Sequence, residues 1–157
     1  MSSDLLHGEV LVGLVVSLVA IAIHAVMMAV LVRTAYRTSH LTRAANALLR
    51  LIVLMWATVT VLMVAHLSEV LVWGAVYDLL RAVPHGVDSF YFAFVNYTTL
   101  GYGDIIPATR WRLLGPLTAM NGVLLFGWST AVMYDILRTI AHVIPMTGAA
   151  ITAGGEH

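Results

Sequence analysis

The sequence predicts an all-α membrane protein, and three observations support this fold class. Hydrophobic residues make up 61% of the 157 residues and charged residues only 10%, whereas soluble domains carry roughly a quarter charged residues. Three segments are apolar over about 20 residues, the length that a bilayer requires. A shorter apolar segment with a glycine-containing turn lies between the last two. We therefore expect three transmembrane helices, one re-entrant helix and an extended loop.

Polar stretches separate the three candidate spans. The first covers Val10–Val32, the second Leu51 to about Trp73, and the third about Leu113 to Tyr134. The first span is too long for the apolar region of a signal peptide and no basic residue precedes it, so we do not expect cleavage. The absence of cysteine excludes disulfides and thiolate metal sites. A net charge of zero gives no reason to expect a nucleic-acid partner.

The placement of the arginines predicts the orientation in the membrane. Loops rich in Arg and Lys face the cytoplasm, and the first connection is the richest in this chain. The N-terminus is then outside the cell and the C-terminus inside. Within this connection, Thr38–Arg50 is expected to form a short basic helix at the cytoplasmic interface. The arginines of the connection are Arg33, Arg37, Arg43 and Arg50.

The short apolar segment "VDSFYFAFVNYTT" is compatible with a helix but cannot cross a bilayer. A dozen helical residues span only about 18 Å, so a re-entrant half-helix is expected, with Asp88 or Ser89 as its N-cap. The chain would return as the extended "TLGYGD". Non-helical backbone at membrane depth needs partners for its polar groups. A dehydrated cation is the natural partner for carbonyl groups placed there.

Residues Thr98–Asp104, "TTLGYGD", resemble the selectivity-filter signature of potassium channels. Leu100 stands where that signature usually has Val or Ile. Gly101 and Gly103 permit backbone angles that other residues resist, so that successive carbonyls can point toward one axis. The resemblance implies K⁺ sites formed by main-chain carbonyls, with the Thr99 hydroxyl closing the innermost site. The implied ion-binding residues are Thr99, Leu100, Gly101, Tyr102 and Gly103, and the first four supply the oxygen ligands.

The resemblance also implies supporting residues around the loop. Asp104 would lie behind the outer mouth, where a partly buried carboxylate needs a hydrogen-bond donor. Many relatives place a donor on the pore helix at the position of Tyr91, so we expect the Tyr91 hydroxyl to hold Asp104, or its ring merely to pack the helix. Val95 stands where some relatives have a glutamate. Thr98 is the third support residue, and the Tyr102 side chain is expected to pack behind the filter.

The third span carries the candidates for gating. Gly122 and Gly127 resemble the glycine hinge of an inner helix. Asp135, at the expected cytoplasmic end, would concentrate cations in a ring of four carboxylates or pair with Arg138. Asn121 would line a central cavity or make a hydrogen bond between helices.

The resemblance covers Leu51 to about Leu137, including Pro107 and Trp111, and suggests three parts. Residues 1–50 form an N-terminal transmembrane helix and a basic interfacial segment, residues 51–142 a potassium-channel-like pore domain, and residues 143–157 a short flexible tail. The first span lacks an arginine repeat, so we expect no voltage sensor, and the tail is too short for a ligand-binding domain. One filter strand per chain cannot close a ring, so a homotetramer is expected.

The predicted function is therefore a potassium-selective channel in the inner membrane, and not an enzyme. Its only expected ligands are the K⁺ ions in the filter, without a cofactor or another small-molecule substrate, and its partners are the lipid bilayer and three further copies of the chain. A weakly selective cation channel is an alternative.

A second class of function is a membrane metal or haem protein that uses His24, His66 and Glu69. Ionisable residues inside a membrane are functional candidates by default. With the expected bounds, however, His24 lies about 21 Å below the outer end of its helix and His66 about 10 Å below the end of its own. We therefore expect the two histidines at different depths and not in one site. For Glu69, bracing of the pore helix and contact with an aqueous rim are both open.

Overall fold

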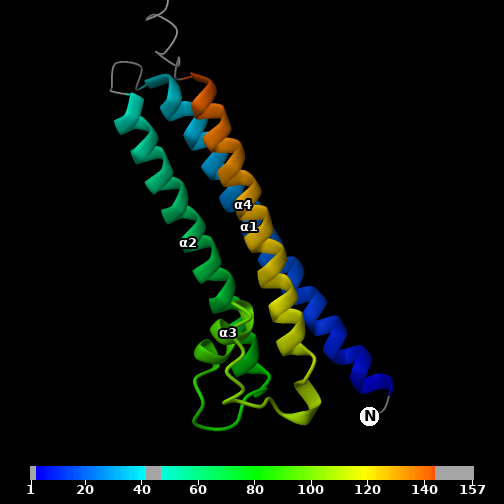
Figure 1. Ribbon diagram of the computed structural model, residues 1–157. Coiled ribbons are helices and arrows are strands. Elements are labelled where there is room, and N and C mark those ends of the chain that lie inside the picture. Colours follow the sequence, from blue (N-terminus) through cyan, green and yellow to red (C-terminus); the bar gives the residue numbers. More distant parts are fainter. Residues whose placement is uncertain (1–2, 42–46, 144–157) are drawn as a thin grey trace, which may run out of the picture.

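The computed structural model describes residues 3–41 and 47–143 as four α-helices and one short 3₁₀ helix (Figure 1). The sequence-based expectation of an all-helical chain with a short helix between the last two long ones is confirmed. In chain order the elements are α1 (Ser3–Leu41), α2 (Ala47–Leu79), α3 (Ser89–Tyr97), η1 (Thr109–Trp111) and α4 (Leu114–Val143).

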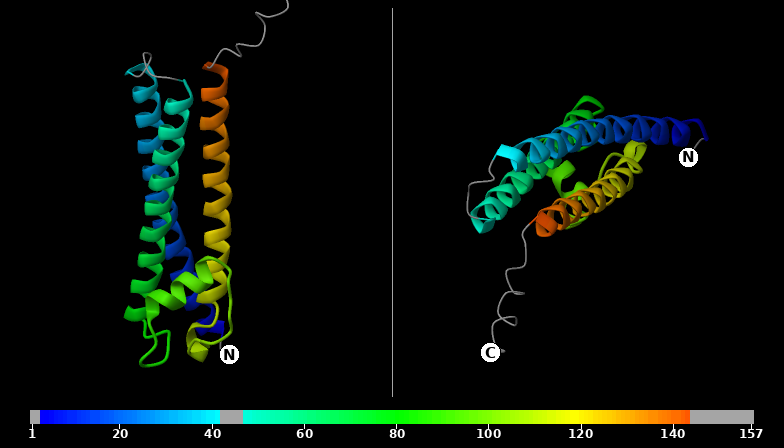
Figure 2. Two further views of the ribbon diagram at one scale, coloured as in Figure 1. Left: turned by 60° about the vertical axis from the view of Figure 1, so that its left-hand side comes forward. Right: turned by 90° about the horizontal axis from the view of Figure 1, so that it is seen from above.

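The three long helices run side by side, and α3 lies at one end of them, between α2 and α4 (Figure 2). The N-terminal end of α1 is at the same end of the bundle as α3 and the loops that flank it. The last turn of α1, the start of α2 and the last turn of α4 lie at the opposite end (Figures 1 and 2). The helix α1 contacts both α2 and α4 within the same chain, which the sequence did not reveal.

Two helices among the described residues are long and apolar enough to cross a membrane, over His7–Thr34 and Leu51–Leu79. The protein is thus a membrane protein with two candidate spans. The third predicted span forms the long helix α4, which is not one of these two and which buries polar residues such as Asn121 and Ser129. A helix whose polar side chains face its neighbours inside a bundle is expected to show this weaker signal.

The predicted interfacial helix over Thr38–Arg50 is wrong in the part that the structure describes. The helix α1 continues without interruption to Leu41, and α2 already begins at Ala47. No Gly or Pro in this stretch breaks the helical pattern, so both long helices extend into it. Residues 42–46 and most of the predicted tail, residues 144–157, lie outside the described part of the chain.

A hydrophobic cluster surrounds α3. Trp73 and Tyr77 of α2, Phe92 and Tyr97 of α3 and Leu114 of α4 are all buried in one cluster. The polar atoms of the two α2 aromatics are satisfied by α4: Trp73 Nε1 donates to Asn121 Oδ1 at 3.1 Å, and the Tyr77 hydroxyl lies 2.5 Å from Thr118 Oγ1. Buried Trp and Tyr side chains usually need such partners. These contacts fix α3 between α2 and α4.

Two glycines let the backbone of α3 approach its neighbours closely. A Cβ atom at Gly74 of α2 would lie 3.1 Å from the Phe90 Cα, and one at Gly122 of α4 would collide with the Tyr97 carbonyl. Small residues at helix contacts are a common device in membrane proteins, where close van der Waals packing replaces the hydrophobic effect. The two ends of α3 are therefore each held against a glycine of a long helix.

Candidate functional site

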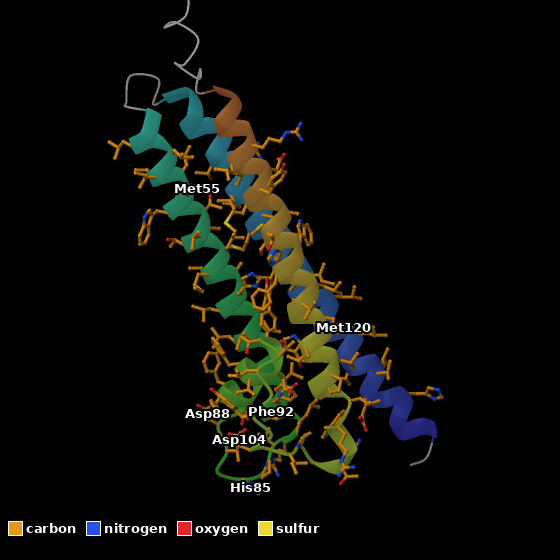
Figure 3. The ribbon with its side chains drawn as sticks, viewed as in Figure 1. Met55, His85, Asp88, Phe92, Asp104 and Met120 are labelled. Atoms are coloured by element: carbon orange, nitrogen blue, oxygen red, sulfur yellow. The ribbon has the colours of Figure 1, made fainter. Side chains whose placement is uncertain are left out.

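The candidate site begins with the N-terminus of α3. Asp88 is the N-cap, and its Oδ1 accepts hydrogen bonds from the main-chain N–H groups of Phe90 at 2.8 Å and Tyr91 at 3.4 Å. Of the two predicted caps, Asp88 is thus the one that the chain uses. Figure 3 shows Asp88, Phe92 and Asp104 gathered at this end of the bundle, far from Met55 on α2.

The helix α3 ends in a tight turn that leads into the TTLGYGD loop. The N–H of Thr99 donates to the Asn96 carbonyl at 2.9 Å and that of Leu100 to the Val95 carbonyl at 3.0 Å. Beyond these bonds the loop from Leu100 to Ala108 contains neither helix nor strand. The chain thus changes from a short helix to a loop without regular secondary structure.

Three residues of this loop have left-handed backbone angles. Gly101 has φ +56° and Gly103 φ +77°, where glycine has no steric penalty, and Thr99 has φ +60°. The glycine motif made the first two predictable. The angle of Thr99 was not predictable, because a β-branched residue rarely adopts it. Such strain costs about 1–3 kcal/mol and is typical of functional sites.

The candidate filter residues lie on the surface of the single chain. Leu100 is 53% exposed and Tyr102 68% exposed, so within one chain the Tyr102 ring is not packed behind the loop as the resemblance implied. The Thr99 side chain is also exposed, and Thr98 Oγ1 donates to the Phe94 carbonyl of its own helix at 2.8 Å. A loop that exposes apolar side chains in this way is typical of a surface that contacts lipid or another protein.

The Tyr91 hydroxyl donates a hydrogen bond to Asp104 Oδ2 at 3.0 Å. This bond raises the pKa of the Tyr91 phenol, because ionisation would place two negative charges side by side. Val95, at the position where a second carboxylate was considered, is buried and apolar. The structure therefore brings together the two residues for which a supporting contact was proposed.

A buried polar cluster lies next to the C-terminal end of α3. Glu69 of α2 accepts hydrogen bonds from three directions. Its Oε1 lies 2.7 Å from His24 Nδ1, its Oε2 lies 3.1 Å from His66 Nδ1, and the Tyr97 hydroxyl donates to Oε2 in a short hydrogen bond. Ser129 Oγ of α4 lies 3.0 Å from His66 Nε2 and 3.3 Å from His24 Nε2. All four α-helices contribute to this cluster.

The prediction that His24 and His66 lie at different depths is wrong. Both Nδ1 atoms lie within hydrogen-bond reach of the Glu69 carboxylate, so the two rings are at the same level. The expected span ends gave no common reference for depth, because α1 already begins at Ser3 and α2 continues to Leu79. Of the two roles considered for Glu69, the contacts fit support of α3. The Glu69 side chain is fully buried and accepts a hydrogen bond from Tyr97 of that helix.

The inner-helix candidates divide into two kinds. Asn121 bonds to Trp73 between helices, and Gly122 is required by the close approach of Tyr97. Gly127 has open space around it, so no packing contact within the chain explains it. Asp135 and Arg138 are both exposed, and the described residues include no ion pair between them.

Sequence reasoning missed Glu9 of α1. Its buried carboxylate accepts a hydrogen bond from the Leu113 N–H at 3.0 Å, just before the first residue of α4. An acidic group is favoured at a helix N-terminus, where main-chain N–H groups are unpaired. The contact joins residues 104 positions apart, and no local sequence signal could have indicated it.

Comparison with known proteins places these features in a family context. A family model described as "Ion channel" matches residues 65–139, just under half of the chain. The match begins next to His66, includes α3 and the TTLGYGD loop, and ends on α4. The matched family is one of ion channels and not of enzymes.

Two curated relatives are each similar to a stretch of fewer than 70 residues of this chain. One is the two-pore potassium channel 4 of Arabidopsis thaliana, 35% identical over 66 residues, which are 41% of this chain and 21% of the relative. The other is a hyperpolarization-activated voltage-gated potassium channel of Methanocaldococcus jannaschii, 34% identical over 67 residues, 43% of this chain and 31% of the relative. The chain thus spans less than a third of the length of either. No solved structure matches it. Residues 65–139 are thus similar to a family of ion channels and distantly similar to potassium channels.

Proposed function

We propose that the chain is one subunit of a homotetrameric potassium-selective channel. The observation that carries the proposal is the TTLGYGD loop, which follows a capped half-helix and has left-handed angles at Thr99, Gly101 and Gly103. Alternating left-handed and ordinary residues turn successive carbonyls toward the same side of the chain. Four such loops around one axis would replace the hydration shell of K⁺ with carbonyl oxygens from Thr99 to Tyr102.

The position of α3 supports cation entry into such a filter. The C-terminal end of a helix carries partial negative charge from its unpaired carbonyls, and α3 ends at Tyr97, directly before the loop. Aromatic packing and two glycine contacts hold the helix in place. A filter needs this rigidity, because its ligands must stay in position when an ion leaves.

We propose a tetramer because a single chain can form only one side of a pore. Ion-channel pore domains typically assemble as tetramers, and one exposed loop per chain fits that arrangement. In the same scheme the N-terminus and the filter lie outside the cell and the C-terminus inside, as the arginine-rich connection suggests. The pore domain is proposed to cover residues 51–142.

A weakly selective cation channel remains the second candidate, and Leu100 is the observation that favours it. A side chain branched at Cγ replaces the usual Cβ-branched Val or Ile between two candidate ligand residues, and it is half exposed. Flux into liposomes tests both candidates. The purified chain in vesicles is expected to let K⁺ pass and to exclude Na⁺. Equal fluxes of the two ions would favour the second candidate.

A further inference from the structure

The cluster of His24, His66 and Glu69 has no part in the proposed conduction pathway. The three side chains come from α1 and α2, and one ligand atom from each lies within 4.8 Å of the other two. His24 and Glu69 are fully buried, and His66 is nearly so. Ionisable groups at membrane depth are costly and are kept when they do something.

Two imidazoles and one carboxylate are a common ligand set for zinc and other first-row transition metals. Calcium and magnesium prefer all-oxygen sites, so the two nitrogen donors argue against them. The imidazole of His24 packs 5.3 Å from the Trp128 ring, and that of His66 packs 4.6 Å from the Phe126 ring. This close packing suits a single ion and leaves no room for a porphyrin against the imidazoles.

The hydrogen bonds of the cluster allow two arrangements of protons. Both Nδ1 atoms face Glu69, and both Nε2 atoms face Ser129 Oγ. In the first arrangement, the Ser129 and Tyr97 hydroxyls donate to ring nitrogens and neutral histidines complete the cluster without an ion. In the second, both rings carry their N–H on Nε2, and the two Nδ1 lone pairs converge with the Glu69 carboxylate as a cation site requires.

A divalent cation between the Nδ1 atoms and Glu69 would select the second arrangement. Each imidazole then carries its proton on Nε2 and donates to Ser129, whose oxygen has two lone pairs. Metal-binding histidines almost always donate their second N–H in this way, which fixes the ring and its tautomer. Ser129 is placed to serve both rings at once. The cation also offsets the negative charge of the buried carboxylate.

We propose that His24, His66 and Glu69 bind one divalent transition-metal ion in each subunit. The site joins α1 to α2 and reaches the pore helix through Tyr97, whose hydroxyl lies 2.9 Å from His66 Nδ1 and donates to Glu69. Tyr97 immediately precedes the first threonine of the filter signature. The ion thus ties the additional helix α1 to the base of the candidate filter, and it is separate from any K⁺ in the loop.

Zn²⁺ binding to the full chain in lipid nanodiscs tests the site directly. Chelator-treated protein is expected to bind one Zn²⁺ per chain in competition with a chromophoric chelator. Co²⁺ in its place is expected to give visible absorption bands of a nitrogen- and oxygen-ligated ion. The temperature of unfolding should rise with Zn²⁺, because the ion binds only the folded arrangement.

Variants separate this site from surface binding. His24→Gln and Glu69→Gln each remove one ligand at nearly constant volume, and a loss of at least 100-fold in Zn²⁺ affinity is expected. Ser129→Ala keeps all three ligands and removes the shared acceptor, so a loss of about 10–100-fold is expected. His85→Gln is the matched control, because His85 is exposed on the loop before α3 and should have no effect.

Two results would overturn the proposal. One is wild-type protein that shows no Zn²⁺ binding and no thermal shift, which would mean that hydrogen bonds alone complete the cluster. The other is unchanged stoichiometry and affinity in Glu69→Gln. If the ligand variants misfold, Ser129→Ala still tests the site, because this substitution keeps all three ligands and the buried charge. None of these measurements depends on ion conduction, so failure of the channel assignment would not affect them.

Discussion

At the scale of single residues, the backbone angles of the loop are the feature most closely tied to function. Thr99, Gly101 and Gly103 all have positive φ, and two of the three are glycines because glycine adopts this conformation without a steric penalty. Thr99 adopts it despite its branched Cβ. Its place directly after α3, where two main-chain hydrogen bonds close the turn, supplies the contacts that hold the strained residue.

Gly101→Ala is expected to abolish selective K⁺ flux. A Cβ at φ +56° costs about 1–2 kcal/mol in each subunit, and relief of this strain would rotate the neighbouring carbonyls away from the axis. Gly86→Ala is the matched control, because Gly86 has φ +85° in the loop before α3 and open space around it. It should lose similar stability yet retain selectivity. K⁺ and Na⁺ fluxes of both variants in liposomes give the comparison, and wild-type preference in Gly101→Ala would refute the filter assignment.

Tyr91→Phe is expected to loosen the outer end of the filter. The substitution keeps the ring and removes only the hydroxyl that donates to Asp104. We expect a less stable tetramer at low K⁺ and a faster decay of current during sustained opening. Gel analysis of the heated tetramer and recordings in planar bilayers provide the measurements. Unchanged stability and steady current would mean that another group holds Asp104.

At the scale of elements, the contact of α3 with α4 depends on one glycine. The Tyr97 carbonyl occupies the space where a Cβ of Gly122 would lie, whereas Gly127, one and a half turns further along α4, faces open space. The resemblance placed both glycines in a hinge. The packing gives Gly122 a different and sufficient reason, and only Gly127 is left as a candidate for bending.

Gly122→Ala and Gly127→Ala form a matched pair that tests this distinction. Overpacking at Gly122 should destabilise the chain by about 1–3 kcal/mol, whereas Gly127→Ala should be neutral or slightly stabilising, because Ala favours helix over Gly by about 1 kcal/mol. Thermal unfolding in detergent measures both. Equal stability of the two variants would show that α4 does not press against Tyr97.

The sequence predicted elements better than contacts. The Asp88 cap and the half-helix followed by a glycine loop could be read locally, because their signals lie within a few residues of each other. The end of α2 could not, since Gly74 and Asp78 weaken the apolar pattern while the helix continues. The start of α1 at Ser3 was missed as well, so depths counted from the expected span ends did not show that His24 and His66 lie at one level. Glu9 with Leu113 and Trp73 with Asn121 are long-range pairs, which only the packing of complete helices determines.

At the scale of the whole molecule, one chain leaves its functional loop uncovered. Leu100 and Tyr102 are exposed, as are apolar residues of α4, among them Val123 and Leu124. A surface of this kind is expected to be covered by lipid or by another subunit. Residues 65–139 carry the match to ion channels, whereas most of α1 lies outside it and contacts α2 and α4 of its own chain.

The tetramer makes a simple prediction about mass. Native mass spectrometry of the purified channel should give four times the 17.0 kDa of the chain, because four equivalent loops are needed to surround one ion. The stability of this species should increase with K⁺ and not with Na⁺, since only the fitting ion bridges all four loops. A dimer as the largest species in both salts would contradict the assembly.

The reversal potential under bi-ionic conditions tests the central claim most directly. The purified chain is reconstituted in a planar bilayer with K⁺ on one side and Na⁺ at the same concentration on the other. A carbonyl-lined filter predicts a large reversal potential, with the sign set by K⁺ moving down its gradient. A reversal potential near zero with clear single-channel currents would contradict potassium selectivity and identify a weakly selective cation channel.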